Sequence, residues 1–245
     1  MNMPENNILY SVIIPAYNEE KFLPDCLTAL KNAMHTIEKK GEIIVTDNNS
    51  TDKTSELAKR FGARVVFEKK NHISRARNRG AENAKGKFLV FLDADTIISP
   101  GLLKAAIGNL ESGSCCGGGS LVSLDRVRGR WDLKFVRLWN RIATRRNVAA
   151  GCFIYCLKEA FSGVGGFSEK VYVSEELWLS RALKKWGRKN RKAFRIIRDF
   201  PIKTSGRKMD RPFRCLVATF LCVFFPIFIF SRTLCWFWYK RKFEE

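Results

Sequence analysis

Signals for strands and helices alternate along the first hundred residues, and this alternation restricts the fold more than any other feature of the chain. Short apolar runs at residues 10–14, 42–46, 64–67 and 87–92 are typical of buried strands. Segments with helical spacing of apolar residues separate and follow them, at 22–37, 51–61, 74–84 and 100–110. Strands joined by single helices pair in parallel through right-handed crossovers. We therefore predict an α/β, Rossmann-like fold with a mostly parallel central sheet.

The second half of the chain is less regular. Gly117–Gly119 precede an apolar run at 121–124, either as a flexible loop or as a bulged entry to a strand. Further on we expect a helix at 131–146, a strand at 153–157, and a helix from Glu175 that Gly187 closes. A chain of 245 residues with 46% hydrophobic residues can bury one sizeable core. We expect one domain over residues 1–210, with halves at about 9–97 and 98–210.

The last part of the chain differs in kind. Residues 215–230 carry no charge, the apolar character continues to Tyr239, and basic residues flank both ends. We predict that residues 211–245 form a hydrophobic helical segment that associates with a membrane, by spanning it or by lying on it. Because residues 1–7 lack the apolar core of a signal peptide, we expect the domain at the cytoplasmic face of the cell membrane.

The charge and the cysteines narrow the classes of partner. The formal net charge is +20, which implies an anionic partner such as a membrane surface, a phosphorylated substrate or nucleic acid. No recognition helix or RNA-binding aromatic pattern favours nucleic acid, so a non-enzymatic basic module stays a weaker hypothesis. The eight cysteines and two histidines lack zinc-site spacing, and they fit buried thiols in a reducing compartment.

The strongest chemical signal is an acidic motif that ends the fourth apolar run, Phe88-Leu89-Val90-Phe91-Leu92-Asp93-Ala94-Asp95-Thr96. Parallel sheets bind ligands at the carboxyl ends of their strands, so both carboxylates are expected to face one crevice. Oxygen ligands there suit Mg²⁺ or Mn²⁺ bound to nucleotide phosphates. The structural alternative is a turn in which Asp95 or Thr96 caps the helix after Pro100.

A second enzyme class fits the same residues. An apolar strand followed by an Asp-x-Asp pair resembles the nucleophile motif of haloacid-dehalogenase-type phosphatases, with Asp93 attacking phosphorus and Asp95 acting as acid. That motif normally lies on the first strand, whereas three strand–helix units precede it here. No later acidic pair is found to complete a magnesium site.

Several motifs, in consistent order and spacing, favour another enzyme class. They are Val12–Glu20, Val45–Asp52, Ala76–Gly80, the acidic motif, Gly165–Phe167 and Ser174–Arg181. Together they resemble the family 2 glycosyltransferases, which have the nucleotide-binding GT-A fold, over roughly Leu9 to Thr204. The resemblance implies a nucleotide-diphospho-sugar donor and a divalent cation, Mg²⁺ or Mn²⁺. The nucleotide-binding half would then be residues 9–97, and the acceptor half 98–210.

The resemblance also implies roles for individual residues. The donor would be bound by Pro15, Ala16, Tyr17, Glu19, Asp47, Asn48, Arg77, Asp93 and Ala94. Asp47 would contact the base or ribose, Arg77 the phosphates or base, and Asp95 would hold the metal. The family often has a second acid where Asn48 stands, so the base preference is left open.

Glu175 and Glu176 match the family's acidic pair at the start of a helix, with Glu176 as the general base. An acceptor hydroxyl that attacks the anomeric carbon opposite the diphosphate must lose its proton to such a carboxylate, which suits inversion. The structural alternative is that both acids only stabilise a helix N-terminus. The Gln-x-x-Arg-Trp string of processive members is missing, so we expect addition of a single sugar. The acceptor would be lipid-linked or a saccharide, in cell-surface polysaccharide or glycolipid synthesis.

Overall fold

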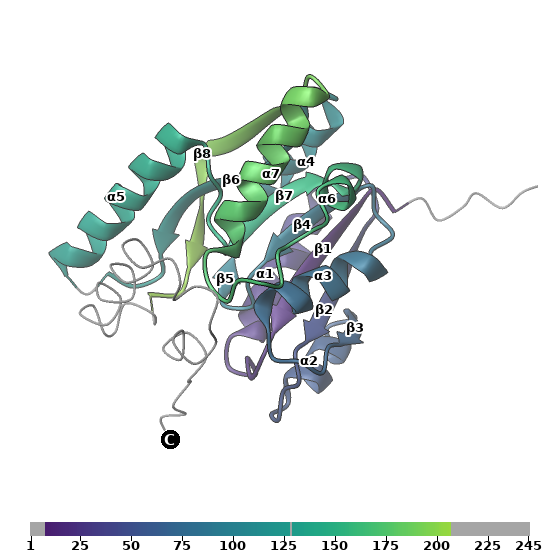
Figure 1. Cartoon of the computed structure of the whole chain (residues 1–245). Coiled ribbons are helices and arrows are strands. Elements are labelled where there is room, and N and C mark those ends of the chain that lie inside the picture. Colours follow the sequence, from purple (N-terminus) through teal and green to yellow (C-terminus); the bar gives the residue numbers. More distant parts are fainter. Residues whose placement is uncertain (1–7, 128, 207–245) are drawn as a thin grey trace, which may run out of the picture.

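The computed structural model describes residues 8–127 and 129–206, and one eight-stranded sheet runs through them (Figure 1). The strand order is β3-β2-β1-β4-β7-β6-β8-β5. The strands are β1 (Tyr10–Ala16), β2 (Gly41–Asp47), β3 (Arg64–Phe67), β4 (Phe88–Leu92), β5 (Thr96–Ile97), β6 (Cys115–Leu124), β7 (Phe153–Leu157) and β8 (Ala193–Thr204).

The half of the sheet that contains β1–β4 is parallel throughout. β1 pairs with β2 on one side and with β4 on the other, and β2 pairs with β3. Every residue of β1 and of β4 is buried, as in strands that are covered on both faces. The predicted strands and the parallel pairing of this half are confirmed.

The other half of the sheet mixes directions. β7 is antiparallel to β4 and to β6, while β6 is parallel to β8 and β5 is antiparallel to β8. The sequence did not predict β8, because Arg195, Arg198 and Pro201 interrupt its apolar residues. It therefore lacks the continuous hydrophobic run that revealed the strands of the first half.

The glycine run belongs to a strand. β6 begins at Cys115, so Gly117–Gly119 lie inside it, and the loop interpretation is wrong. A Cβ on Gly118 would collide with the carbonyl oxygen of Arg195 in β8, and a Cβ on Gly119 would lie 2.6 Å from the Cβ of Ala149. The glycines thus let neighbouring backbone approach closely, and the register shifts near the start of the strand, as the bulged-entry interpretation predicted.

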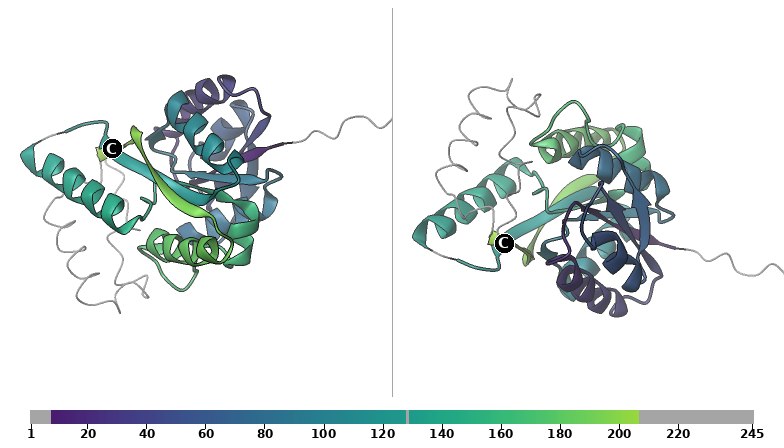
Figure 2. Two further views of the ribbon diagram at one scale, coloured as in Figure 1. Left: turned by 90° about the horizontal axis from the view of Figure 1, so that it is seen from above. Right: turned by 90° about the horizontal axis from the view of Figure 1, so that it is seen from below.

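Helices cover both faces of the sheet. α1 packs against α2 and α4 on one face, whereas α3, α6 and α7 lie on the other. Figure 2 shows α1 and α7 on opposite sides of the sheet, and α5 projects from this body. The helices are α1 (Leu23–His35), α2 (Thr54–Arg60), α3 (Ile73–Asn83), α4 (Pro100–Glu111), α5 (Arg130–Arg146), α6 (Lys158–Gly163) and α7 (Glu175–Lys189).

Gly187 does not end the helix that contains it, which corrects the predicted boundary. α7 continues to Lys189. A Cβ on Gly187 would lie 2.5 Å from the carbonyl oxygen of Lys192 and 2.6 Å from the sulfur of Cys116. The glycine is therefore explained by close packing of α7 against the end of the following loop and β6.

The predicted membrane-associating segment, residues 211–245, lies outside the described residues. Within residues 8–127 and 129–206, none of the helices combines the length and the apolar character that crossing a bilayer requires. The thiols that the structure describes fit the expectation of unpaired cysteines: Cys26, Cys115, Cys116 and Cys156 are free and buried.

Candidate active site

The ends of β1 and β2 bring together residues that were predicted to bind the donor. Ala16, the last residue of β1, pairs in register with Asp47, the last residue of β2, and Pro15 and Ala16 are both buried. The carbonyl of Ala16 accepts a hydrogen bond from the N–H of Asn48 (2.8 Å). Oδ1 of Asp47 accepts one from the N–H of Ser50 (2.9 Å), which closes the turn after β2.

Asn48 holds the loop that joins β3 to α3. Its amide nitrogen donates to the carbonyl oxygens of Glu68 (3.1 Å) and Lys70 (2.5 Å). Its Oδ1 accepts a hydrogen bond from the N–H of His72 (2.9 Å). Both amide hydrogens are therefore engaged within the protein. The structure gives Asn48 this structural role, and its contact with a nucleotide base stays a prediction.

His72 lies at the start of α3 as its N-terminal cap. Its Nδ1 accepts a hydrogen bond from the N–H of Ser74 (3.2 Å), and its ring centroid lies 4.6 Å from that of Tyr172. Burial lowers the pKa of His72, which favours the neutral ring that this cap requires. The contact between the rings of His72 and Tyr172 connects α3 to the loop that precedes α7.

The loop after β1 carries Tyr17 and Glu19 and is fixed to the start of α2. The N–H of Glu19 donates to Oγ1 of Thr54 (2.8 Å), and the N–H of Glu20 donates to Asp52 (3.1 Å). Oδ1 of Asp52 also accepts a hydrogen bond from the N–H of Thr54 (3.0 Å), the first residue of α2, whereas the N-terminal cap of that helix is Lys53. The loop is therefore held beside the turn that follows β2.

The acidic motif follows β4 directly. The N–H of Asp93 donates to the carbonyl of Cys152 (3.1 Å), and the carbonyl of Asp95 accepts a hydrogen bond from the N–H of Ser205 (3.2 Å). The motif is thus anchored to the loop before β7 and to the residues after β8. Both anchors come from the second half of the chain, which the motif joins to the first.

The structure contradicts the alternative in which the motif caps a helix. The cap of α4 is Ser99, whose hydroxyl accepts a hydrogen bond from the N–H of Leu102 (3.3 Å). Thr96 instead begins the short β5, and its hydroxyl lies 3.1 Å from that of Thr204. Asp95 is buried and lies outside the helix. Its position therefore needs an explanation other than capping.

Arg77 lies at the centre of the site and is 2% exposed. Its Nη1 donates to Oε1 of Glu175 (2.6 Å). Its Nη2 donates to Oδ1 of Asp93 (2.8 Å) and to the carbonyl of Gly151 (2.8 Å). The guanidinium carbon lies 5.1 Å from the ring centroid of Phe167, within cation–π range. Arg77 on α3 thereby connects the end of β4 with the start of α7.

Electrostatics keep this buried arginine charged. Burial by itself disfavours the cation, but the nearby carboxylates of Asp93 and Glu175 outweigh it and raise the pKa of Arg77. A buried charge with paired partners of this kind positions them firmly. The structure therefore shows Arg77 as an internal strut, while its direct contact with donor phosphates stays a prediction.

Glu176 lies beside this strut, partly buried. A Cβ built on Gly151 would lie 3.7 Å from the carboxyl carbon of Glu176 and 3.7 Å from Nη2 of Arg77, so the two side chains flank the same backbone position. Among the residues that the structure describes, Glu176 forms no ion pair. Burial, followed by the negative charge of Glu175, raises the pKa of Glu176 to about 8. We call Arg77, Asp93, Glu175 and Glu176 the Arg77 cluster.

Two contacts of the Arg77 cluster were missed from the sequence. Gly151 carried no signal, because its carbonyl and not a side chain takes part. Phe167 lies in a motif that was noticed, but it was given no role. Asn78 holds it in place: the Asn78 amide donates to the carbonyl of Phe167 (2.9 Å) and accepts from its N–H (2.9 Å). Asn78, the residue directly after Arg77, thus fixes Phe167, whose ring lies against the guanidinium.

The carboxylates of this site fit a divalent cation that is shared with a substrate. Asp93 pairs with Arg77, and Asp95, the acid predicted to hold the metal, is buried two residues further on. Within the described residues, no three His, Cys, Asp or Glu side chains gather as a complete metal site. Mg²⁺ is commonly held by one or two carboxylates together with substrate phosphates. The donor set therefore suits a cation that binds along with a nucleotide diphosphate.

Comparison with known sequences gives the family. Residues 11–163 match the sequence profile described as Glycosyl transferase family 2. This chain belongs to that family. Glycosyltransferase AglE of Haloferax volcanii is 28% identical to this glycosyltransferase over 184 residues, which are 70% of the chain and 60% of AglE. The minor teichoic acid biosynthesis protein GgaB of Bacillus subtilis is 35% identical over 107 residues, 41% of the chain and 12% of GgaB. The chain spans 60% or less of the length of these two relatives.

Solved structures share the fold of this family 2 glycosyltransferase. The mannosyltransferase PcManGT from Pyrobaculum calidifontis, in complex with GDP-Man and Mn²⁺, matches with a TM-score of 0.63 at 20% identity, over 86% of this chain and 60% of PcManGT. S. aureus TarS 1–349 in complex with UDP-GlcNAc matches with a TM-score of 0.62 at 20% identity, over 81% of this chain and 58% of that protein. The predicted GT-A type of fold is confirmed.

Proposed function

We propose that this family 2 glycosyltransferase transfers a single sugar from a nucleotide-diphosphate donor to an acceptor hydroxyl, with inversion at the anomeric carbon. The observation that carries the proposal is the different environment of two adjacent acids. Glu175 is held by Arg77 at 2.6 Å, whereas Glu176 forms no ion pair within the described residues and lies against the backbone of Gly151. One acid is structural, and its neighbour is left to exchange a proton.

The chemistry follows from this division. The acceptor oxygen bonds to the anomeric carbon while the bond from that carbon to the diphosphate breaks, and the hydroxyl proton passes to the carboxylate of Glu176. A divalent cation at Asp95 would neutralise the charge on the departing nucleoside diphosphate. Arg77 fixes the carboxylate of Glu175 and keeps the start of α7 close to the end of β4. A single base on one side of the donor suits one displacement and therefore inversion.

The donor and the cation are proposed from both site and relatives. The ends of β1 and β2 supply Pro15, Ala16 and Asp47, and the loop after β1 supplies Tyr17 and Glu19, at one edge of the sheet. The neighbours with bound ligands contain a GDP-sugar with Mn²⁺ or a UDP-sugar. This supports a nucleotide-diphospho-sugar donor with Mg²⁺ or Mn²⁺ as the cation.

The acceptor and the location are proposed more broadly. We place the protein at the cytoplasmic face of the cell membrane and assign it to the synthesis of a cell-surface polysaccharide or glycolipid. The basic composition and residues 211–245 support a membrane location. The teichoic acid role named for GgaB supports an acceptor of the cell surface. The phosphatase and nucleic-acid hypotheses gain no comparable support.

The test separates binding from transfer. A panel of UDP- and GDP-sugars with Mn²⁺ is screened by thermal stabilisation, and release of nucleoside diphosphate to water is then measured with the donor that binds. Glu176→Gln is expected to retain donor-dependent stabilisation and to release nucleotide about 100- to 10,000-fold more slowly. Asp95→Asn is expected to lose the part of the stabilisation that depends on Mn²⁺.

The matched control is Glu111→Gln, which changes an exposed acid at the end of α4 in the same way. It should match the wild type in both measurements. Release at the wild-type rate by Glu176→Gln would overturn the assignment of the base. Stabilisation of the wild type by none of the donors would overturn the proposed function as a whole.

A further inference from the structure

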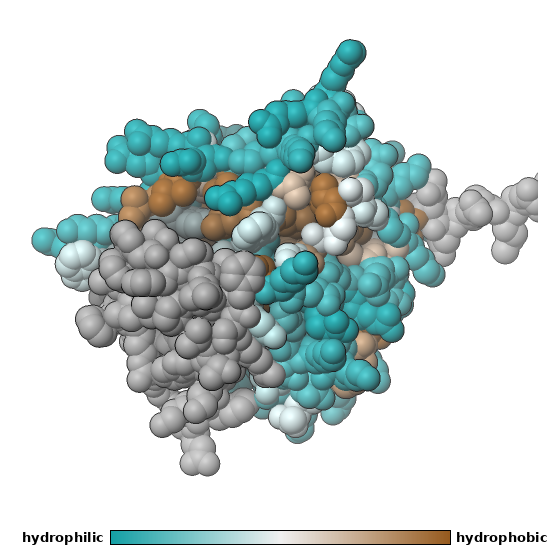
Figure 3. Space-filling model, in the orientation of Figure 1, coloured by the Kyte–Doolittle hydropathy of each residue, from teal (hydrophilic) through white to brown (hydrophobic). Residues whose placement is uncertain are grey.

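α5 presents an apolar stripe that the rest of the described protein leaves uncovered. Trp131, Phe135, Leu138 and Ile142 recur at intervals of four, three and four residues, which places them along one side of the helix. All four are exposed, and Trp131 and Leu138 are 74% and 56% exposed. In Figure 3 apolar surface lies over the part of the molecule that contains α5. An unburied stripe of this size on a surface helix indicates an interaction site.

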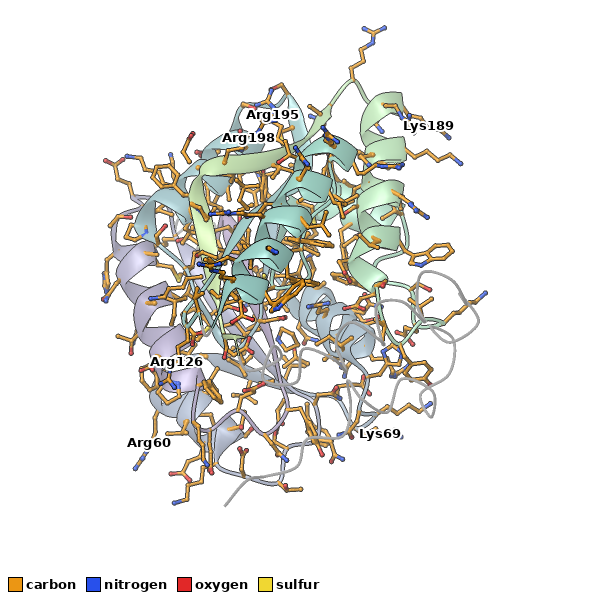
Figure 4. All side chains as sticks on the ribbon, turned by 90° about the vertical axis from the view of Figure 1, so that its left-hand side faces the viewer. Arg60, Lys69, Arg126, Lys189, Arg195 and Arg198 are labelled. Carbon is orange, nitrogen blue, oxygen red and sulfur yellow. The ribbon has the colours of Figure 1, made fainter. Side chains whose placement is uncertain are left out.

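A basic stripe runs beside the apolar one. Each of the four apolar residues is preceded directly by an exposed basic residue, and a fifth lies one turn further on: Arg130, Lys134, Arg137, Arg141 and Arg145. Nζ of Lys134 lies 4.7 Å from the ring centroid of Trp131, so the charge is held over the aromatic face. Figure 4 looks onto this side of the molecule and shows further basic side chains there, Arg195 and Arg198 of β8.

The opposite side of α5 attaches it to the domain. Asn140 binds the backbone of Val122 in β6 at both ends of its amide, accepting from the N–H and donating to the carbonyl at 2.9 Å each. Ala143 is buried, and the carbonyl of Arg146 accepts a hydrogen bond from Lys184 of α7 (2.8 Å). The helix is therefore fixed in orientation, with its two stripes turned away from these contacts.

We propose that α5 is an interfacial helix that docks the protein on an anionic lipid surface. The apolar stripe enters the boundary between headgroups and acyl chains, and the basic stripe binds headgroup phosphates. Helices that lie in the membrane plane combine these two features, with aromatic and leucine side chains on one face and Lys and Arg on the other. The inference concerns residues that lie outside the Arg77 cluster, and it holds whether or not the proposed transfer is correct.

Charge decides between a lipid surface and other partners. Residues 211–245 contain an apolar run, but Arg211, Arg214 and Lys240–Lys242 flank it with charges of the same sign as the basic stripe. A second copy of the chain carries a net charge of +20 and would be repelled. Anionic headgroups complement the basic stripe while the acyl region takes up the apolar one.

Docking through α5 would bring the active site close to the bilayer. Gly151, whose carbonyl binds Arg77, follows Arg146, the end of α5, by five positions along the chain. At no more than about 3.6 Å per position, the end of α5 lies within about 18 Å of Gly151. An acceptor that is itself embedded in the membrane could then be reached without leaving it.

Hydrogen exchange on vesicles tests the proposal locally. The full chain is mixed with vesicles of equal parts phosphatidylcholine and phosphatidylglycerol, or of phosphatidylcholine alone. We expect amide exchange across residues 130–146 to slow at least several-fold with the anionic vesicles and to be unchanged with the neutral ones. If the chain sediments with the anionic vesicles while exchange across α5 stays the same, the proposal is wrong, because another segment is then responsible for binding.

Charge reversal supplies the matched comparison. Arg137→Glu with Arg141→Glu should weaken partition onto the anionic vesicles by about thirty-fold or more, since each basic residue near such a surface contributes about five-fold to partition. The control is Lys59→Glu with Arg60→Glu on α2, which changes the net charge equally at the other end of the sheet. Equal weakening by both pairs would contradict α5 as the docking element.

Removal of the apolar stripe is the second arm. Trp131→Ser with Leu138→Ser should weaken partition by about ten-fold or more and leave the thermal unfolding of the exposed helix little changed. Phe67→Ser, which removes an exposed aromatic ring from β3, should leave partition unchanged. Wild-type partition of the α5 variant would show that the stripe does not enter the bilayer.

Discussion

The two halves of the sheet are stabilised in different ways. In β1–β4 the strands are parallel, β1 and β4 are buried along their whole length, and single helices connect them. In β5–β8 the strands change direction, β6 is bulged, and β8 is mostly exposed, with single buried residues at intervals. The strands of the first half can be recognised from continuous apolar runs, whereas β8 of the second half cannot. Close approach at glycines occurs in both halves, at Gly80 and Gly86 in the first and at Gly118 and Gly187 in the second.

The site lies where these halves meet, and it uses both. Arg77 comes from α3 in the first half, and its partner Glu175 comes from α7 in the second. The ends of the parallel strands β1 and β2 carry residues that are predicted to bind the donor. The buried ion pair of Arg77 with Glu175 links this half to α7, in addition to the pairing of β4 with β7, and its removal shows how much the link contributes.

Replacement of Arg77 by Met should have the largest effect. It leaves the buried carboxylate of Glu175 and the partly buried one of Asp93 without their cation, and loss of one partner from such a group costs about 3–5 kcal/mol of unfolding free energy. Urea unfolding measures the change. Arg79→Met, on the same helix but exposed, should change stability by less than about 0.5 kcal/mol. A small loss for Arg77→Met would mean that the pairing of β4 with β7 and the apolar core are sufficient to hold the two halves together.

Leucine truncations compare the two ways of using a helix. Leu27 of α1 is buried against the parallel half, and Leu27→Ala should cost about 2–5 kcal/mol of unfolding free energy. Leu138 of α5 is exposed, and Leu138→Ala should cost less than about 0.5 kcal/mol. Thermal unfolding of both variants in the absence of lipid checks this. A comparable loss for Leu138→Ala would indicate that α5 is buried in solution and would weaken its assignment to membranes.

Two glycines in the second half of the chain test whether the space around a glycine decides the sign of a substitution. Gly187→Ala should destabilise by about 1–3 kcal/mol, since its Cβ would approach the carbonyl of Lys192 and the sulfur of Cys116. No heavy atom lies within 4 Å of the place that a Cβ on Gly108 of α4 would occupy. Gly108→Ala should therefore stabilise the protein by about 0.5–1 kcal/mol. Chemical unfolding of the two variants should therefore give shifts of opposite sign.

The pH dependence of nucleotide release gives the smallest and most specific test. The pKa of Glu176 is raised to about 8 by burial and by Glu175, and a base acts only after losing its proton. The rate should therefore increase with pH and level off above about 8. Glu175→Gln removes the neighbouring negative charge. The rise in rate should then occur at a lower pH, by about one unit or less.

The raised pKa of Glu176 also affects the free energy of unfolding, and Glu111→Gln serves as the control for the rate measurement. A carboxyl group with a raised pKa favours the folded state while it is protonated, so its contribution is present at low pH and is lost as pH rises towards about 8. Glu111→Gln should not change the pH dependence of nucleotide release, because that side chain is exposed at the end of α4. If Glu175→Gln leaves the pH dependence of nucleotide release unchanged, another group is the base.

The sequence predicted the first half well, since continuous apolar runs and turn residues are local signals. β3 and β7 were predicted with their observed bounds, at Arg64–Phe67 and Phe153–Leu157. β8 was not predicted, because its pairing with β5 and β6 makes it a strand and its own residues give no clear strand pattern. Gly187 was misinterpreted for a related reason: a glycine that ends a helix and a glycine that admits a neighbour have the same letter.

The site shows the same division. The motifs identified Arg77, Asp93 and the two glutamates as important residues, but not as partners of one another. That Arg77 binds Glu175, 98 residues away, follows from the packing of α3 against the loop before α7 and from no local pattern. The role of Gly151 could not be predicted, because a backbone carbonyl leaves no trace in residue identity.

Asn48 has a consequence for anyone who wishes to redesign donor choice. An acid introduced there would lose both donated bonds and would point a carboxylate at the carbonyls of Glu68 and Lys70. The peptide that precedes α3 would then have to refold before any new base could be accommodated. Exchange of this one side chain, which is predicted to contact the nucleotide base, would therefore require residues 68–72 to be rebuilt with it.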